Sequence, residues 1–422
     1  MTEQDLYDAQ ASNRRPAVSF GHTVTPVCLV TPLALGDSEE NNVEDFEGHS
    51  LYSRDLLSAL RKKWTISVVA NQTSKAGPGE PGVYRVWKPG FQYPFRMLRQ
   101  VLKTHAKVVH FERLGPTVFG PYFTVPFVPF LALVLRLLQK RVLVSFSDVV
   151  DVDKVDPAFL RAFQSWLHAP ALVRIGLTYF YFFTGKFANT IFTQTRNSRV
   201  VLQRKYRIDS AKVKLVPLSG PAPNLDLSTE PAKKVLGLEH KKVLLFFGHL
   251  APYKGLEALI EAQAIVQNHR PDVTLVIAGG NHRRIHDDYL GRLRDLAREK
   301  EANVRFTGYL PSESIPTVFS AADIVVYPCS SIPGSSGCVN LTKQYGKPLV
   351  TTRAVAKEEG IAHLLDAYVI PEASPSLIAA AVLKLLGDDS LAVHLCNNLA
   401  RTSVPIDIIA DDISSTYQRL LA

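Results

Sequence analysis

The stretch KKVLLFFGHLAPYKGLE, residues 241–257, decides the fold of this chain. Its residues 243–247 are all apolar, and so short a run is typical of a strand that is buried on both faces of a parallel sheet. Gly248 ends the run, and an amphipathic helix follows from about Gly255. A strand, a short polar loop and a helix in this order predict a helix N-terminus that points at a ligand above the carboxyl edge of the sheet.

Lys254 lies where this helix begins. A cation there opposes the helix dipole, which favours negative charge at the N-terminal end. One interpretation is that Lys254 and the helix amides together hold an anion, most simply a phosphate. The other is an exposed lysine in an ordinary loop. The stretch alone leaves both interpretations open.

The residues that follow repeat the alternation of strands and helices. Further buried-strand candidates are residues 274–278, 304–307, 324–327 and 349–351, with helices between them. This pattern predicts a doubly wound, mostly parallel sheet whose ligands bind at its carboxyl edge. Residues 219–230 (SGPAPNLDLSTE) are rich in Pro and Ser and lack periodicity, so we place the linker to this domain there. The second Rossmann-like domain is expected to span residues 223–403.

The first half of the chain shows the same α/β pattern. Its strand candidates are residues 27–31, 65–70, 107–111, 141–146, 190–193 and 212–218. We expect a Rossmann-like domain over residues 24–222, preceded by a disordered lead-in of residues 1–23. The amphipathic C-terminal helix within residues 404–422 is expected to pack back on it. Residues 36–48 are rich in acid and form either a solvated loop or part of an acceptor site.

Two apolar segments raise the question of a membrane. Residues 116–135 carry no charge, yet four prolines make a continuous spanning helix improbable, so we predict a loop followed by a core helix over 131–138. Residues 169–187 contain five aromatic residues at 179–183 between Arg174 and Lys186. This segment is either a surface helix in a lipid interface or a core helix.

Composition narrows the class of protein. The chain has 422 residues, too many for one core, with 46% hydrophobic and 21% charged residues, as in a globular protein. Its four cysteines lack metal-site spacing, which indicates a reducing compartment and no zinc site. The N-terminal residues do not resemble a signal peptide, so we expect a cytoplasmic protein.

The charge of the chain predicts an anionic partner. A net charge of +9 and a pI near 9.2 suit nucleic acid, a phospholipid surface or a phosphorylated substrate. No zinc-finger spacing or RRM-type motif is present, which makes nucleic acid the weakest of the three and leaves no nucleic acid among the expected partners. Contact with the cytoplasmic face of a membrane is a hypothesis that rests on this charge and on the aromatic residues 179–183.

Three loops of the second domain should meet at one edge of its sheet. They are residues 248–254, the sequence Gly279-Gly280-Asn281, and residues 328–337 (PCSSIPGSSG). Ser335, Ser336 and Gly337 open a helix and would offer hydroxyls and amides to an anion, although plain N-capping by serine is the common alternative. A lysine loop and a Ser-Ser-Gly loop on the same edge together predict a site for a diphosphate.

Four segments now resemble a family. FFGHLAPYKGLEALIEA, VTLVIAGG, VRFTGYLPSESIPTVFSAADIVVYP and SSGCVNLTKQYGKPLVTT occur in the order, and close to the spacing, of the retaining nucleotide-sugar glycosyltransferases of family 4 (glycosyl transferases group 1). The resemblance is good over roughly residues 241–386. It is weaker over the first domain, where ANTIFTQTRNSRVVLQRKYRIDSAKVKLVPLSG is similar to the usual lead into the linker. The resemblance implies a GT-B architecture, an α/β fold of two Rossmann-like domains facing across a cleft.

The resemblance also implies a reaction. A sugar passes from a nucleoside-diphosphate donor to a hydroxyl of a glycan or lipid-linked acceptor, with retention and without an essential metal or other cofactor. Lys254 would bind the donor diphosphate and act in catalysis, helped by His249. The turn that is formed by Ser335, Ser336, Gly337 and Cys338 would hold diphosphate oxygens. The nucleoside would lie against Gly279, Gly280, Gly308, Tyr309 and Leu310.

The sequence departs from the family pattern at three positions. Many members carry two glutamates eight positions apart near the donor, where this chain has Pro333 and Leu341. The frequent His-Asp pair of the first domain is replaced by Ser147-Asp148, and Asp148 would still orient the acceptor or the donor sugar. These departures motivate an alternative, a catalytically silent GT-B protein that binds a nucleotide sugar or a partner transferase. An NAD-dependent oxidoreductase is poorly supported, because no strand leads into Gly-x-Gly-x-x-Gly.

Overall fold

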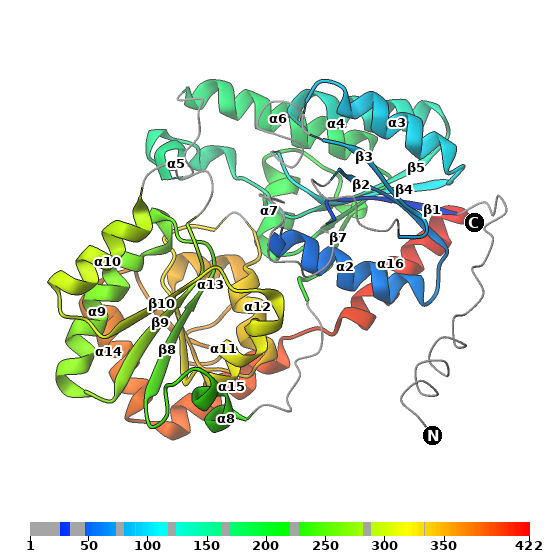
Figure 1. The fold of residues 1–422 in the computed structure, drawn as a ribbon. Coiled ribbons are helices and arrows are strands. Elements are labelled where there is room, and N and C mark those ends of the chain that lie inside the picture. The colour runs from blue at the N-terminus through cyan, green and yellow to red at the C-terminus, as the bar shows by residue number, and fades with distance from the viewer. Residues whose placement is uncertain are drawn as a thin grey trace, which may run out of the picture.

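The chain forms two α/β domains, seen in Figure 1. The computed structural model describes residues 26–33, 47–72, 80–88, 90–116, 124–162, 169–219, 228–281, 288–332 and 334–422. The predicted lead-in, most of the acid-rich loop and most of the linker lie outside these residues, as does Pro333.

The first domain is built on a parallel sheet of seven strands in the order β3-β2-β1-β4-β5-β6-β7. These strands are β1 (Val27–Val30), β2 (Ile66–Asn71), β3 (Val83–Trp87), β4 (Val108–Leu114), β5 (Arg141–Phe146), β6 (Thr190–Thr193) and β7 (Val213–Leu215). Its helices are α2 (Glu47–Arg61), α3 (Tyr93–Lys103), α4 (Thr124–Leu137), α5 (Pro157–Ala162), α6 (Pro170–Phe187) and α7 (Arg196–Arg204). Central strands β4 and β5 are almost wholly buried, as expected for a parallel sheet that is covered on both faces. Residues 142–144 of β5 form an apolar run, whereas β4 is buried although it contains His110, Glu112 and Arg113.

The second domain has a parallel sheet of six strands in the order β10-β9-β8-β11-β12-β13. These strands are β8 (Lys242–Phe247), β9 (Val273–Ala278), β10 (Val304–Gly308), β11 (Ile324–Tyr327), β12 (Leu349–Thr352) and β13 (Tyr368–Ile370). Its helices are α8 (Thr229–Val235), α9 (Leu256–His269), α10 (Tyr289–Glu299), α11 (Ile315–Ala321), α12 (Gly337–Gln344), α13 (Arg353–Glu359), α14 (Pro375–Leu386) and α15 (Asp389–Arg401). The strand order reverses between β8 and β11. In a doubly wound sheet, ligands are expected at the carboxyl ends of the two strands where this reversal occurs.

The last helix, α16 (Ile406–Leu421), runs back to the first domain and packs against α2 (Figure 1). Lys62 and Lys63 of α2 form ion pairs with Asp407 and Asp411 at 2.8 and 2.5 Å. Tyr417 is fully buried, and its hydroxyl lies 2.7 Å from Nδ1 of His110 on β4. The chain therefore crosses between the domains twice.

The proline-rich apolar segment differs from the prediction. Helix α4 begins at Thr124 instead of near residue 131, and Pro129 lies inside it. Pro126 falls in the first turn, where its missing N–H loses no intrahelical hydrogen bond. Pro126 therefore does not prevent the helix from starting at Thr124, and the helix continues through Pro129 to Leu137. Among the described residues no helix is long and apolar enough to cross a membrane.

Candidate functional site

Three glycines end neighbouring strands of the second sheet and bring their backbones together. The amide of Gly279, after β9, donates to the carbonyl of Gly308 at the end of β10 at 3.0 Å. A Cβ on Gly279 would lie 1.9 Å from the carbonyl oxygen of Gly248, and the φ of Gly279 is +150°. Only glycine fits at position 279, so close packing of the strand ends explains Gly279 without a ligand. Directly after Gly308 comes Tyr309, whose side chain is 56% exposed.

The predicted nucleoside-binding residues lie together at this edge. A Cβ on Gly280 would come within 3.7 Å of the Tyr309 side chain, so the two residues are neighbours. Leu310 is half-buried against the core of the second domain. The exposed Tyr309 ring and the bare backbone at Gly280 form a surface on which a flat base can stack.

The lysine loop, residues 248–254, packs directly against the serine-rich loop, residues 328–337. After β8 the chain makes a short turn over Pro252–Lys254 and then enters α9 through Gly255, whose φ of +72° is left-handed. A Cβ on Gly255 would lie 2.5 Å from the carbonyl oxygen of Pro328. The amide of Ser330 donates to the carbonyl of Tyr253 at 2.9 Å. The convergence expected of these two loops is thus fixed by backbone contacts.

The ammonium of Lys254 is held by aromatic rings. It donates to the hydroxyl of Tyr327 and lies 4.8 Å from the ring centroid of Tyr327 and 5.1 Å from that of Tyr253. Burial alone would lower the pKa of Lys254, but Cys329, Tyr327 and Tyr253 outweigh this effect and raise that pKa well above its usual value. No carboxylate among the described residues pairs with this ammonium. A half-buried cation without a carboxylate partner is suited to an anionic ligand.

The serine-rich turn holds a carboxylate of the protein itself. The hydroxyl of Ser335 and the amide of Ser336 donate to Oε1 of Glu359 at 3.1 and 2.5 Å. The other carboxylate oxygen of Glu359 lies 3.2 Å from Nζ of Lys343. Ser336 also caps α12, because its hydroxyl accepts from the amide of Val339 at 3.4 Å.

These contacts leave a smaller part of the turn for a ligand. In the described part of the chain, the amides of Gly337 and Cys338 have no carboxylate or capping partner. These first-turn amides lack intrahelical acceptors by geometry. Burial raises the pKa of the Cys338 thiol to about 12, so it stays neutral, and Lys254 is among the charges near enough to lower that pKa. The two amides and the ammonium of Lys254 are therefore the groups that remain to donate to an anion here.

Asp148 reaches the same place from the first domain. It forms an isolated antiparallel bridge with Gly334, and a Cβ on Gly334 would lie 2.5 Å from the carbonyl oxygen of Ser147. The hydroxyl of Ser147 donates to Oδ2 of Asp148 at 3.2 Å, and the hydroxyl of Tyr181 on α6 donates to the carbonyl of Asp148 at 2.8 Å. Asp148 and the serine-rich loop are therefore in contact across the two domains. His249, in the lysine loop, is exposed.

A second contact between the domains was not anticipated from the sequence. Glu358 on α13 is buried, and its carboxylate accepts from the hydroxyls of Thr195 and Ser198 at 2.6 and 3.1 Å and from the side-chain amide of Asn197. Thr195 is the N-cap of α7 in the first domain. A carboxylate at a helix N-terminus is favoured by the unpaired amides and the helix dipole. Glu358 and Glu359 are adjacent in sequence, yet one binds the first domain and the other binds the serine-rich turn.

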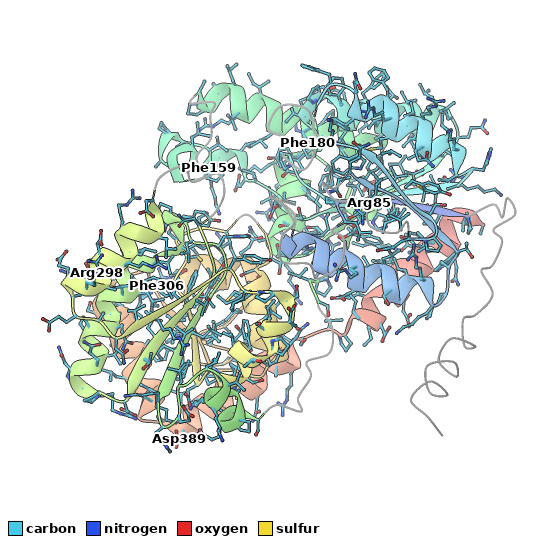
Figure 2. The ribbon with its side chains drawn as sticks, viewed as in Figure 1. Arg85, Phe159, Phe180, Arg298, Phe306 and Asp389 are labelled. Atoms are coloured by element: carbon cyan, nitrogen blue, oxygen red, sulfur yellow. The ribbon has the colours of Figure 1, made fainter. Side chains whose placement is uncertain are left out.

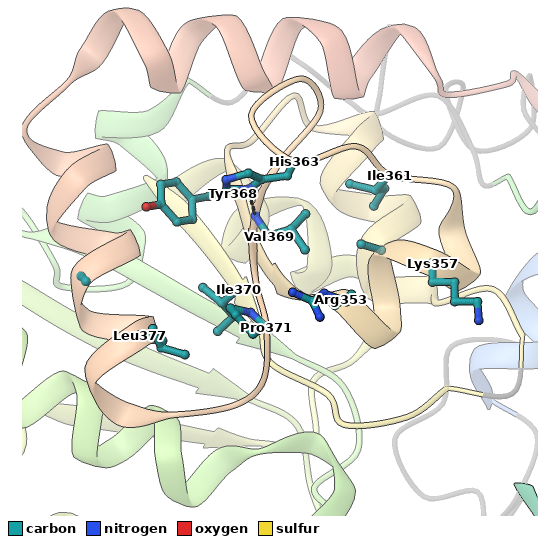
Figure 3. A pocket seen from close by; sticks show the side chains of 11 residues that line it. Arg353, Lys357, Ile361, His363, Tyr368, Val369, Ile370, Pro371 and Leu377 are labelled. Carbon is teal, nitrogen blue, oxygen red and sulfur yellow. Dashed lines mark hydrogen bonds between the residues drawn. The ribbon is translucent and has the colours of Figure 1, made fainter.

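A hollow of about 600 Å³ lies elsewhere, beside the edge strand β13 (Figure 3). Arg353 and Lys357 of α13 line it together with His363 and Tyr368. Nδ1 of His363 accepts from the amide of Val369 at 3.0 Å, which covers part of the edge strand. The hollow is three strands away from β8 and is not part of the predicted site. In the residues that the structure describes, no cluster of three or more His, Cys, Asp or Glu side chains could hold a metal ion.

Comparison with known protein families finds a match to the second domain. Residues 228–402 match the family Glycosyl transferases group 1. The chain is 35% identical over 173 residues to YtcC of Bacillus subtilis (strain 168), which is named as a glycosyltransferase. It is 29% identical over 218 residues to the D-inositol 3-phosphate glycosyltransferase of Corynebacterium glutamicum (strain R). These matches cover 39% and 49% of this chain and 42% and 51% of those proteins, so the chain spans about half the length of the curated relatives it matches.

Solved structures extend the likeness to the first domain. HepE of Anabaena, crystallised with UDP-glucose, superposes with a TM-score of 0.68 at 14% identity, covering 93% of this chain and 99% of HepE. WaaG, a glycosyltransferase involved in lipopolysaccharide biosynthesis, superposes with a TM-score of 0.66 at 16% identity, with coverage of 93% and 99%. The predicted fold is confirmed: the chain is an α/β protein with two parallel Rossmann-like sheets in the GT-B arrangement.

Proposed function

We propose that the protein is a retaining glycosyltransferase that moves a sugar from a nucleoside-diphosphate sugar to a hydroxyl of a glycan or lipid-linked acceptor, without an essential metal. One observation carries the proposal. The ammonium of Lys254 has no carboxylate partner among the described residues and lies in a loop that packs against the serine-rich loop. The match of residues 228–402 to the group 1 glycosyl transferases supports it.

The site suits departure of a diphosphate. When the bond between the sugar and the donor breaks, negative charge develops on the leaving phosphate. Lys254 and the amides of Gly337 and Cys338 would stabilise that charge, because fixed donors in a partly dehydrated site need no reorganisation during the reaction. His249, which is exposed in the same loop, would assist, and the serine-rich turn would contribute where the Ser335 hydroxyl and the Ser336 amide exchange Glu359 for a phosphate oxygen. A fixed cation there would do what a bound metal does in other transferases.

The other predicted residues receive roles by position. Asp148 would orient the acceptor or the donor sugar, since it reaches the serine-rich loop from the opposite domain. Gly279, Gly280 and Gly308 would bound the nucleoside, with Tyr309 stacked on the base and Leu310 behind it. HepE binds UDP-glucose in its crystal structure, so UDP sugars are the first donors to test.

A specific observation favours a second candidate, a silent GT-B protein that binds a nucleotide sugar or a partner transferase. Leu341, where many family members have a glutamate, is half-buried and packs against the core of the second domain. An apolar side chain there cannot accept hydrogen bonds from a donor ribose or sugar.

Activity measurements separate the two candidates. Donor hydrolysis and transfer should be followed with UDP, GDP and ADP sugars for the wild type, Lys254→Ala and Lys241→Ala. Lys241 is exposed and precedes β8, at the opposite end of the strand from Lys254, which makes it a matched control. The transferase proposal predicts turnover that Lys254→Ala abolishes and Lys241→Ala preserves. Donor binding without turnover in any of the three proteins would favour the silent protein instead.

A further inference from the structure

The outer layer of the first domain has an unusual charge. Helices α3, α4 and α6 lie side by side across it (Figure 1), and α4 packs along α6. Together the three helices contain six Lys and Arg residues and no Asp or Glu. All six cationic residues are exposed, and five of them belong to the outward side: Arg96, Arg99, Lys103, Arg136 and Lys186. The sixth, Arg174, lies on the same side of α6 as the buried Tyr181 and donates to the carbonyl of Val155 at 3.0 Å. We call the outward side of these helices the α3–α4–α6 face.

Large apolar side chains are exposed on the same face. On α6, Leu172, Ile175 and Tyr179 follow the i, i+3, i+7 spacing of one helix side and are 57%, 65% and 39% exposed. Helix α3 and the turn before it contribute Phe95 and Phe91, which are 67% and 72% exposed. Others on or just after α4 are Phe130, Leu137 and Leu138. Apolar groups gathered in this way mark an interaction surface.

The inward side of α6 is ordinary core. Two of the five aromatic residues on which the membrane hypothesis was based therefore belong to the core of the domain. Phe180 (labelled in Figure 2) and Tyr181 are fully buried and pack against Phe146 of β5 with ring centroids 6.0 and 5.2 Å apart. These two rings anchor the helix to the sheet and are not available to lipid. The exposed residues Leu172, Ile175 and Tyr179 lie on the opposite, outward side of the helix.

We propose that the α3–α4–α6 face docks onto a membrane surface that contains anionic phospholipids. Cations without carboxylates attract an anionic headgroup layer, while apolar side chains between them can enter the acyl boundary. A second copy of the chain is a poorer partner, because two such faces would place five like charges against five. No spanning helix is needed for this mode of binding.

The docking face is linked to the candidate site by one helix. Tyr181, on the inward side of α6, donates its hydroxyl to the carbonyl of Asp148 at 2.8 Å. Docking through α6 would therefore hold Asp148 near the membrane, where a lipid-linked acceptor is presented. This role of the docking in presenting an acceptor rests on the proposed function, whereas the docking itself does not.

Flotation with lipid vesicles tests the docking without any donor or acceptor. The full chain is mixed with phosphatidylcholine vesicles with and without phosphatidylglycerol, at low and high ionic strength. We expect binding to the anionic vesicles at low salt and release at high salt, because exposed charges are then screened. Arg96→Gln/Arg99→Gln should weaken partition about 25-fold, at roughly fivefold for each cation. Leu172→Ser/Ile175→Ser should weaken it by a similar factor, at about fivefold for each side chain.

Matched controls come from the second domain. Lys234→Gln/Lys241→Gln removes two exposed cations, and Val235→Ser/Val393→Ser removes two exposed apolar side chains, at 70% and 56% exposure. Both controls should bind like the wild type. Failure of the wild type to float with anionic vesicles at low salt would overturn the proposal. So would equal losses in the control variants, or self-association without lipid that the α3–α4–α6 variants abolish. Transfer activity with a soluble acceptor has no bearing on these outcomes.

Discussion

Removal of the Glu358 carboxylate should loosen the contact between the two domains. This carboxylate accepts three side-chain hydrogen bonds, from Thr195, Asn197 and Ser198, at the N-terminus of α7. A hydrogen bond to a charged group contributes about 1.5–3 kcal/mol. The three bonds share one acceptor group and are not additive, so we expect Glu358→Ala to lower the free energy of unfolding by at least about 1.5–3 kcal/mol, the contribution of one such bond.

Equilibrium urea unfolding of the full chain, followed by circular dichroism, gives the first measurement. Glu372→Ala removes an exposed glutamate of the same domain and should change the free energy of unfolding by less than about 0.5 kcal/mol. A double-mutant cycle of Glu358→Ala with Thr195→Val isolates the contact and should show a coupling of about 1–3 kcal/mol. A coupling indistinguishable from zero would refute the reasoning, even if Glu358→Ala alone were destabilising.

Three further predictions follow from the packing. Gly279→Ala should destabilise the second domain by more than about 2 kcal/mol in thermal unfolding, because the new Cβ would lie 1.9 Å from the carbonyl oxygen of Gly248. A free energy of unfolding within about 0.5 kcal/mol of the wild type would argue against this packing. Tyr417→Phe should cost about 1–3 kcal/mol in the same measurement, because it removes the hydroxyl that bonds His110; a neutral change would contradict that bond. Native protein should be alkylated at pH 8 mainly at Cys396, because it is only half-buried, whereas the other three cysteines are closed to the reagent. Burial raises the thiol pKa of all four, so accessibility decides the order of labelling. Mass spectrometry should find three cysteines alkylated only after unfolding: Cys28, Cys329 and Cys338. Their rapid labelling in the native protein would contradict the burial.

The elements that could be predicted are those whose evidence is local. Strands β8 and β9 are buried on both sides, so their apolar runs are continuous in the sequence. Edge strands β3 and β13 were missed, since they have five and three residues and are largely half-exposed, which leaves no such run. Helix α4 was predicted too short because prolines were read as breakers, although one of them falls in a first turn.

The site was predictable in part for the same reason. The order of strand, loop and helix in the sequence identified the lysine loop and the serine-rich loop, whose backbones do contact each other. The partners of those loops could not be read from the sequence. Glu359 holds the serine turn from 23 residues away, and Glu358 binds Thr195 across 163 residues and two domains. A pair of glutamates at the end of a short helix carries no local signal of either contact, because it also suits a solvated helix end.

Calorimetric titration of UDP into the wild type, Lys254→Met and Lys241→Met tests the central claim most directly. The account predicts that Lys254→Met weakens binding by about 10- to 150-fold, the loss of one charge-assisted hydrogen bond of about 1.5–3 kcal/mol to a phosphate. Lys241→Met should bind as the wild type does. Equal affinity of the wild type and Lys254→Met for UDP would contradict the claim that this ammonium holds the donor diphosphate.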